Sequence, residues 1–223
     1  MIKTVDLSKS YYLGEEEVKA VDNINIEIKE GEYVSILGPS GCGKSTLMYL
    51  LGLLETPSEG KVYLDGKDVS DLDDKQLSLI RNQSVGFVFQ TFNLINKFTV
   101  WENVLLPTRY YKGEDLGFDP EERAEDLLKK MGIWERRNFF PNKISGGQQQ
   151  RAAIARSLIM KPRIVLADEP TGNLDSETGE EIMNLIEKMN KETGVTIVLV
   201  THEKPVADLT EREIHMIDGR VTK

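Results

Sequence analysis

This sequence of 223 residues has one cysteine and two tryptophans. It has only short apolar runs, and its net charge is negative. Its one cysteine, Cys42, excludes an internal disulfide framework and a multi-cysteine zinc site, and is typical of a reducing compartment. The longest apolar runs, such as residues 47–54 and 195–200, are far shorter than the roughly 18 residues that a membrane-spanning helix needs. The first six residues contain no apolar core of the kind that a cleavable leader has. We therefore expect a globular protein of the cytosol.

The net charge of the chain limits the partners that it is expected to bind. The chain has 28 lysine and arginine residues against 37 aspartate and glutamate residues, which gives a net charge of −9. An acidic chain is not expected to bind nucleic acid through bulk electrostatics, so we expect no nucleic-acid partner.

Strand patterns alternate with helix patterns along the chain. Residues 24–28 alternate apolar and polar side chains, whereas residues 182–189 have the spacing of an amphipathic helix. Short apolar runs typical of buried strands lie at residues 33–37, 85–90, 164–167 and 195–200, and residues 214–221 read as a hairpin turning at Asp218-Gly219. Helical patterns prevail from about residue 91 to residue 160. This order predicts an α/β protein with a parallel sheet and a helical insert.

A glycine-rich segment follows the strand predicted at residues 33–37 and leads into a helix predicted over residues 44–54. Residues 38–45 match the pattern G-x-x-x-x-G-K-[ST], in which backbone N–H groups surround phosphate oxygens. Lys44 would supply a charge to the β- and γ-phosphates, and Ser45 a hydroxyl ligand for Mg²⁺. The alternative is a glycine-rich turn that precedes Lys-Ser by chance. The candidate phosphate-binding residues are Gly38, Pro39, Ser40, Gly41, Cys42, Gly43, Lys44, Ser45 and Thr46.

A second candidate site element is the end of the strand at residues 164–167. Asp168 follows this apolar run, where P-loop enzymes hold magnesium, usually through a bound water. Glu169 is next in the chain and is placed to orient or deprotonate an attacking water. The alternative is that Asp168, Glu169 and Pro170 are only the polar end of a buried strand.

A third motif distinguishes among the many kinds of P-loop enzyme. Residues 144–151, Ile-Ser-Gly-Gly-Gln-Gln-Gln-Arg, resemble the signature of the ABC (ATP-binding cassette) family, which usually begins with Leu rather than Ile144. Ser145 is a good N-cap for the helix that follows, and the two glycines allow a ligand to approach closely. Other family motifs occur in the expected order along essentially the whole chain: an aromatic residue at Tyr11, the Q-loop at Gln90, the D-loop at residues 173–175 and the switch histidine at His202.

The resemblance implies a fold, two cofactors and a set of site residues. The fold would be a P-loop NTPase core with a mainly parallel sheet, an N-terminal antiparallel β subdomain and an inserted helical signature subdomain. We expect a single domain over residues 1–223, with a catalytic core at 1–90 and 161–223 and a helical subdomain at 91–160. The cofactors would be ATP and Mg²⁺. The implied roles are catalysis for Glu169 and His202, magnesium binding for Ser45, Gln90 and Asp168, and nucleotide contacts for Tyr11, Gln90, Ser145, Gly146, Gly147, Gln148 and Asp175.

The resemblance also implies partners. Two such chains would dimerise head to tail, with each ATP between one P-loop and the signature of the other subunit. Residues 86–94 and 168–175 look like the branch of macrolide-efflux, lipoprotein-releasing and antimicrobial-peptide-resistance ATPases. The membrane subunit would be a separate permease, which places this chain at the cytoplasmic face of the cell membrane. The alternative function is an ABC ATPase that regulates a cell-wall or cell-division complex without transport.

Three placements stay open. Tyr11 and Tyr12 lie on opposite strand faces, so only one can stack on adenine, and Tyr11 is favoured. His215 is expected at the surface of the last hairpin. The aromatic cluster of Phe92, Phe98 and Trp101 is either a docking surface for the membrane subunit or the core of the helical lobe.

Overall fold

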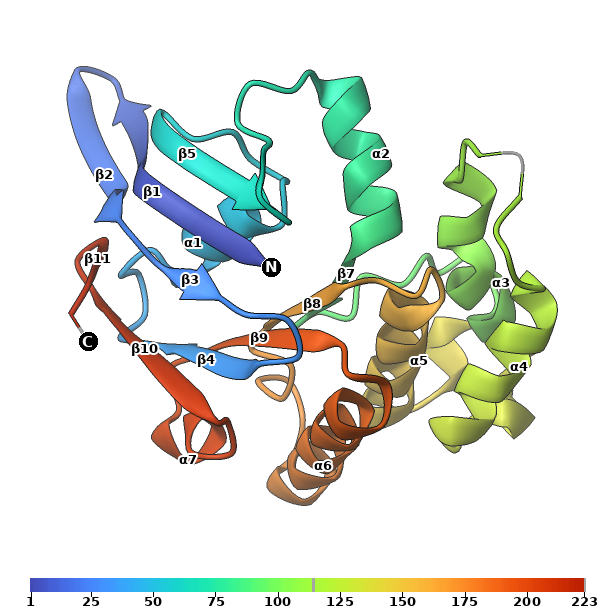
Figure 1. Ribbon diagram of the computed structural model, residues 1–223. Coiled ribbons are helices and arrows are strands. Elements are labelled where there is room, and N and C mark those ends of the chain that lie inside the picture. Colours follow the sequence, from blue (N-terminus) through green and yellow to red (C-terminus); the bar gives the residue numbers. More distant parts are fainter. Residues whose placement is uncertain (114, 223) are drawn as a thin grey trace. The chain divides into compact units, whose positions relative to one another are not determined.

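The computed structural model describes residues 1–113 and 115–222 (Figure 1). The chain folds as two compact units, one of residues 1–78 with 196–223 and one of residues 79–195. Helix α2 (Asp74–Ser84) begins in the first unit and ends in the second.

An antiparallel sheet forms the N-terminal part of the first unit. Its strands β1 (Ile2–Leu13), β2 (Glu16–Ile24), β5 (Glu59–Leu64) and β6 (Lys67–Asp68) lie in the order β2-β1-β5-β6, and β3 (Glu27–Ile28) pairs with β1. The strand predicted over residues 24–28 is interrupted, because the buried Thr4 hydroxyl donates to the Ile24 carbonyl and accepts from the Ile26 N–H. The Thr4 side chain thus replaces part of the backbone hydrogen bonding between the strands.

Parallel strands form the rest of the first unit. Strand β4 (Tyr33–Leu37) pairs in parallel with both β9 (Thr196–Thr201) and β10 (Arg212–Ile217), and β11 (Arg220–Val221) completes the predicted hairpin with β10. Residues 33–36 are all buried, as expected for a strand covered on both faces. Helices α1 (Lys44–Leu51) and α7 (Lys204–Ala207) belong to this unit. Helix α1 ends three residues before the predicted boundary because Leu53 turns to the left-handed region at φ 59°.

The second unit is mostly helical. Strand β7 (Val85–Phe89) pairs in parallel with β8 (Ile164–Asp168). The helices of this unit are α3 (Val100–Leu105), α4 (Pro120–Lys130), α5 (Gly146–Leu158) and α6 (Ser176–Thr193), with short 3-10 helices at Leu106–Tyr110, Trp134–Arg136 and Pro141–Lys143. Helix α5 lies very close to β7, since a Cβ built at Gly86 would come 2.4 Å from the Ser157 carbonyl oxygen. This contact brings the helix that starts at Ser145 beside the strand that ends before Gln90.

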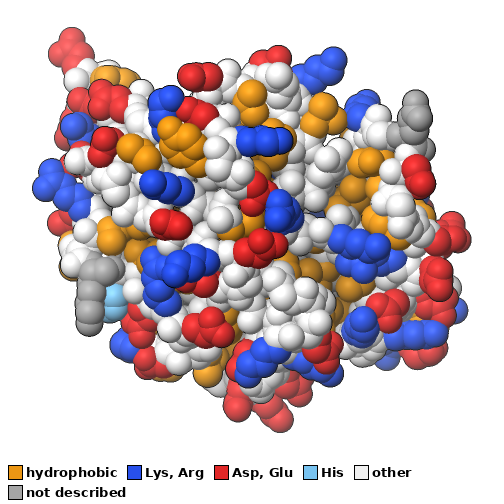
Figure 2. Space-filling model, viewed as in Figure 1, with side chains coloured by type: hydrophobic (Ala, Val, Ile, Leu, Met, Phe, Trp, Pro, Cys, Tyr) orange, Lys and Arg blue, Asp and Glu red, His pale blue; other side chains and the backbone are white. Residues whose placement is uncertain are grey.

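Charged side chains of both signs are interspersed on the face shown in Figure 2. Helix α4 illustrates the local arrangement, with exposed ion pairs one turn apart between Lys129 and Glu125 (2.6 Å) and between Lys130 and Asp126 (2.9 Å). Exposed pairs of this kind contribute only about 0.3–0.5 kcal/mol each. They support the helix but do not decide its position.

Candidate active site

The glycine-rich loop lies between β4 and α1, as the sequence predicts. Gly41 (φ 80°) and Gly43 (φ 99°) are both in backbone conformations that L side chains rarely adopt. A Cβ at Gly43 would also lie 1.9 Å from the Ala20 carbonyl oxygen. The loop therefore keeps its curl only with glycine at this position.

Helix α1 starts at this loop without a cap. No side chain among the described residues hydrogen-bonds to its N-terminus, which begins at Gly43. By contrast, side chains cap α3, α4, α5 and α6, through Thr99, Asp119, Ser145 and Asp175. The dipole of the helix favours an anion at this end.

Lys44 is the first residue of α1 and only 5% exposed. Its ammonium group donates to the carbonyl oxygens of Gly38 and Pro39, both at 2.8 Å. The ammonium group is therefore held against the backbone of the glycine-rich loop. Ser45 and Thr46 follow in the first turn of the helix and are half-buried.

The two N-terminal tyrosines differ in their surroundings. Tyr11 is 37% exposed and Tyr12 72%. The Tyr11 hydroxyl donates to Glu55 Oε2 at 2.6 Å, and Lys9 Nζ lies 5.4 Å from the centre of its ring. Burial, followed by the Glu55 hydrogen bond, raises the pKa of Tyr11. Tyr11 is thus fixed beside the segment that follows the P-loop helix, whereas Tyr12 is mostly exposed.

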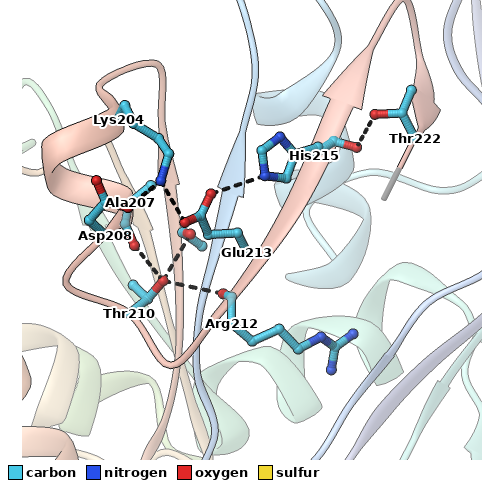
Figure 3. Close-up of polar contacts among 9 residues, drawn as sticks. Lys204, Ala207, Asp208, Thr210, Arg212, Glu213, His215 and Thr222 are labelled. Atoms are coloured by element: carbon cyan, nitrogen blue, oxygen red, sulfur yellow. Dashed lines mark hydrogen bonds and ion pairs between the residues drawn. The ribbon is translucent and has the colours of Figure 1, made fainter.

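His202 is exposed directly after β9, the strand beside β4. The segment that follows His202 in the chain forms ion pairs with β10 (Figure 3). Lys204 contacts Asp208 and also Glu213, at 2.8 Å, and the other Glu213 oxygen lies 3.0 Å from His215 Nε2. The two hydrogen bonds, first that with Asp208, raise the pKa of Lys204. His215 is half-exposed on β10, as predicted, and belongs to this surface network.

In the second unit, the candidate catalytic carboxylates lie at the end of β8. Asp168 is the last residue of the strand and Glu169 the first of the turn. Glu169 adopts the left-handed conformation (φ 43°), and its carbonyl accepts from the Gly172 N–H at 3.0 Å. The carboxyl-terminal edge of parallel strands is where α/β proteins bind ligands.

Gln90 follows β7, the strand paired with β8. Its side chain lies against the turn after Glu169, because a Cβ at Gly172 would come 2.6 Å from Gln90 Nε2. The Gln90 carbonyl accepts from Asn173 Nδ2 at 2.9 Å. The Q-loop and the D-loop are thus in contact within this unit.

The signature residues form the start of α5. Ser145 caps the helix by accepting from the Gln148 N–H (3.3 Å), and the Gln148 side chain accepts from the Ser145 N–H (3.1 Å). This reciprocal capping box was not predicted, although the S-x-x-Q spacing signals it. A Cβ at Gly147 would lie 2.5 Å from Thr178 Cγ2, and at Gly146 3.3 Å from Leu174 Cδ2. The signature glycines thus give room to the start of α6.

Asp175 caps α6. It accepts from the Thr178 N–H at 3.0 Å and from the Thr178 hydroxyl at 2.7 Å. The backbone hydrogen bond from Thr178, followed by the side-chain one, lowers the pKa of Asp175. Because Thr178 also crowds Gly147, the D-loop aspartate and the signature are linked through one side chain.

The comparisons with known proteins agree with these motifs. A family model described as ABC transporter matches residues 21–172. The chain is 52% identical over 225 residues to the ABC transporter ATP-binding protein MJ0796 of Methanocaldococcus jannaschii, covering 100% of this chain and 96% of that protein. The chain belongs to the ABC transporter family. It is also 47% identical over 219 residues to the macrolide export ATP-binding/permease protein MacB of Bdellovibrio bacteriovorus, covering 98% of this chain and 33% of MacB.

A solved structure supports the fold and the activity class. The dimeric post-hydrolysis state of the cassette MJ0796 bound to ADP and Pi matches with a TM-score of 0.91 and 49% identity, covering 100% of this chain and 97% of that one. The predicted ABC ATPase, its P-loop fold with a mainly parallel sheet and an antiparallel N-terminal sheet, and its likeness to the macrolide-efflux branch are confirmed. Among the residues that the structure describes, no helix has the length and hydropathy to span a bilayer.

The candidate magnesium ligands of this ABC protein fit the ion chemically. Ser45, Gln90 and Asp168 carry hydroxyl, amide and carboxylate oxygens, the hard donors that Mg²⁺ prefers. The described residues contain no cluster of three or more His, Cys, Asp and Glu side chains that could hold a metal. The three side chains would hold the ion together with phosphate oxygens and water.

Several residues at the site were not predicted from the sequence. Asn173 holds the Gln90 carbonyl, and Arg156 on α5 donates to the carbonyls of Phe92 and Asn93. Gln150 is fully buried, and its Nε2 donates to the Pro170 carbonyl oxygen at 2.6 Å, just after Glu169. No local pattern marks these side chains, because their partners lie 20 to 83 residues away in the chain.

Proposed function

We propose that this chain is the ATP-binding and ATP-hydrolysing subunit of a transporter, and that two copies close head to tail around two ATP molecules. The observation that carries the proposal is the match over the whole chain to MJ0796, whose solved structure is a dimer with ADP and Pi. In such a dimer, Ser145, Gly147 and Gln148 contact the γ-phosphate held by the partner subunit's Lys44. The residues 91–160 form the helical subdomain of a single ATPase domain.

The phosphate site is built from one subunit's own groups. The N–H groups of the loop at residues 38–43 and the uncapped start of α1 bind phosphate oxygens, and Lys44 turns its ammonium group to the β- and γ-phosphates. Tyr11 stacks on adenine with its hydroxyl held by Glu55. Ser45, Gln90 and Asp168 would hold Mg²⁺, which would supply positive charge to the phosphates when bound.

Hydrolysis needs a base and a group that senses the γ-phosphate. Glu169 accepts the proton of the attacking water, and its left-handed backbone turns it away from the strand that Asp168 ends. His202 contacts the γ-phosphate and helps to align Glu169, and Asp175 of the partner subunit contacts His202. The closed dimer binds ATP more tightly than the open state does. ATP binding therefore closes the dimer, and hydrolysis opens it.

The work of the cycle goes to a separate membrane subunit at the cytoplasmic face of the membrane. The likeness to the ATP-binding third of MacB supports efflux, or extrusion of a lipoprotein or peptide. The surface after Gln90, with Phe92, Phe98 and Trp101, contacts that subunit. All three side chains are half-buried, so they are available to a partner while still packing in the helical part.

The dimer is tested with Glu169→Gln, which should retain ATP without hydrolysing it. Light scattering should give the monomer mass of 25.2 kDa without nucleotide and about twice that mass with saturating ATP, as expected of a symmetric dimer. The control is Lys44→Ala in the same background, which should stay monomeric. A chain that stays at 25.2 kDa with bound ATP contradicts the sandwich.

The transport role is tested by the membrane protein that co-purifies with the tagged chain. A permease whose substrate stimulates ATP hydrolysis supports efflux. A cell-wall enzyme or its regulator as the partner, with no substrate moved, contradicts it and supports the regulatory alternative.

A further inference from the structure

The backbone of the Q-loop is held by side chains from other elements. We define the Q-loop segment as residues 90–93. The Gln90 carbonyl accepts from Asn173 Nδ2 at 2.9 Å, the Phe92 carbonyl from Arg156 Nη2 at 2.9 Å, and the Asn93 carbonyl from Arg156 Nη1. Three of the four carbonyls in the segment are thus bound by an amide or a guanidinium group that is distant in the sequence.

The two carbonyls held by Arg156 belong to a strained turn. Phe92 (φ 59°) and Asn93 (φ 49°) are both in the left-handed region, which is unfavourable for residues other than glycine. Two such residues in succession persist only where neighbouring groups fix them. The fork of the guanidinium group, which can donate to two acceptors at once, supplies that constraint.

The Arg156 guanidinium group loses hydration in the folded protein, which costs free energy. Burial lowers its pKa to about 10, and both guanidinium hydrogen bonds go to neutral carbonyl groups. Arg156 is half-buried, and a cation that loses part of its hydration is retained only when its hydrogen bonds compensate. The position of this charge therefore indicates a role that a smaller apolar side chain could not fill.

Helix α5 connects this turn to the signature, because the same helix begins at the Ser145 cap and carries Arg156 about three turns later. The side chain of Phe92 returns to the start of the helix, within 3.6 Å of a Cβ built at Gly146. The segment after Gln90 is therefore in contact with α5 near both of its ends.

We propose that Arg156 is a positioning residue that transmits displacement of the signature helix to Gln90 by holding the Phe92 and Asn93 carbonyls. The inference rests on the proposed dimer, in which the partner's nucleotide contacts the signature. A shift of α5 on engaging that nucleotide then moves the Q-loop as one piece with the helix, so that each magnesium site responds to the nucleotide at the opposite site.

The chain offers a matched control in Arg123 of α4. Its guanidinium group also donates to two successive carbonyls, of Leu158 (2.7 Å) and Ile159 (2.8 Å), and burial also lowers its pKa. Leu158 is the last residue of α5 and Ile159 is its C-cap, so Arg123 binds the carboxyl-terminal end of α5 and not the Q-loop backbone. Arg123→Lys therefore removes a guanidinium fork bound to the end of α5 without removing a hydrogen bond to residues 90–93.

The experiment compares amide hydrogen exchange in Arg156→Lys and Arg123→Lys, each combined with Glu169→Gln. Without nucleotide, exchange across residues 90–96 should be roughly tenfold faster in Arg156→Lys and unchanged in Arg123→Lys, since a lost charge-assisted hydrogen bond is worth about that factor. With ATP and Mg²⁺, residues 145–150 should become protected in both variants. Residues 90–96 should gain protection only in Arg123→Lys and in the parent.

Equal protection of residues 90–96 in both variants overturns the inference while leaving the dimer intact. Absence of protection at residues 145–150 in the parent overturns the proposed dimer instead. If Arg156→Lys does not fold, Arg156→Gln removes the charge and keeps one amide donor group, and the same pattern is expected from it.

Discussion

At the scale of single residues, the turn after β8 stores backbone strain at the proposed base. Glu169 has φ 43°, which costs a residue other than glycine about 1–2 kcal/mol. The hydrogen bond from the Gly172 N–H to its carbonyl helps to hold this conformation. Strain of this kind gathers at functional sites, where the surrounding structure maintains it.

Glu169→Gln should bind ATP normally but hydrolyse it about 10²–10⁴-fold more slowly, because a positioned general base is worth that factor. Single-turnover phosphate release and equilibrium ATP binding measure the two effects separately. Glu180→Gln, at an exposed position of α6, is the control and should keep its rate. Near-normal turnover in Glu169→Gln would remove Glu169 as the base.

The two left-handed glycines of the P-loop should differ in their tolerance of alanine. A Cβ at Gly41 meets nothing within 4 Å, so Gly41→Ala should lower the free energy of unfolding by only about 1–2 kcal/mol, from backbone strain. A Cβ at Gly43 would clash with the Ala20 carbonyl, so Gly43→Ala should cost more and also weaken ATP binding. Urea unfolding and nucleotide titration of both variants would check this, and equal losses would refute the packing argument.

At the scale of elements, the helices differ in whether a side chain caps their first turn. Helices α3, α4, α5 and α6 are capped by their own neighbouring side chains, whereas α1 begins in a glycine loop with no side-chain cap among the described residues. A capped start is stable without a ligand, while an uncapped one is completed by an anion. Within the described part of the chain, helix α7 also starts without a side-chain cap, so it is the glycine loop together with Lys44 that indicates a phosphate site at the start of α1.

The cap of α6 predicts a pH dependence. Its hydrogen bonds lower the pKa of Asp175 below the ordinary value of 3.8, so the folded state binds this proton less readily than the unfolded state. The carboxylate thus stabilises the protein above about pH 4, and this contribution disappears as the pH falls through the lowered pKa. Asp175→Ala should have a lower Tm than the parent at pH 7, with the difference shrinking towards pH 3.

Asp175→Asn is the matched variant, since it keeps an oxygen acceptor for the Thr178 N–H but loses the charge. Its Tm difference from the parent should be smaller than that of Asp175→Ala at pH 7 and should also shrink on acidification. A difference between Asp175→Ala and the parent that is constant from pH 7 to pH 3 would contradict the role of the carboxylate.

At the scale of the whole molecule, the signature should act in trans. Lys44→Ala and Ser145→Arg chains should each be inactive alone. In a mixed dimer, both defects fall on one composite site and leave the other site complete. Mixing equal amounts should restore about a quarter of the parent rate if half of the dimers are mixed and each has one of two working sites. Phosphate release from the mixture measures this, and activity no higher than that of either variant alone would contradict action in trans.

Much of the candidate site was predictable because its signals are local. The spacing of residues 38–45 between a strand and a helix predicts the phosphate loop, and Ser145 is the predicted cap of α5. The order of the motifs along the chain predicted the family, which the comparisons confirm. Boundaries were less certain: the interruption between β2 and β3 depends on the Thr4 hydroxyl, whose partners lie 20 and 22 residues away.

By itself, the sequence determined the chemistry of this ABC protein: a glycine loop with Lys44, a strand ending in Asp168 and Glu169, and a capped signature helix. These features depend on neighbours within a few residues, which spacing alone fixes. Only the tertiary structure decided that Arg156 holds the turn after Gln90 across 64 residues, and that Asn173 holds Gln90 across 83. Such contacts join backbone carbonyls to distant side chains, and since every residue has a carbonyl, only the tertiary packing of α5 and of the turn after β8 against the end of β7 selects the partners.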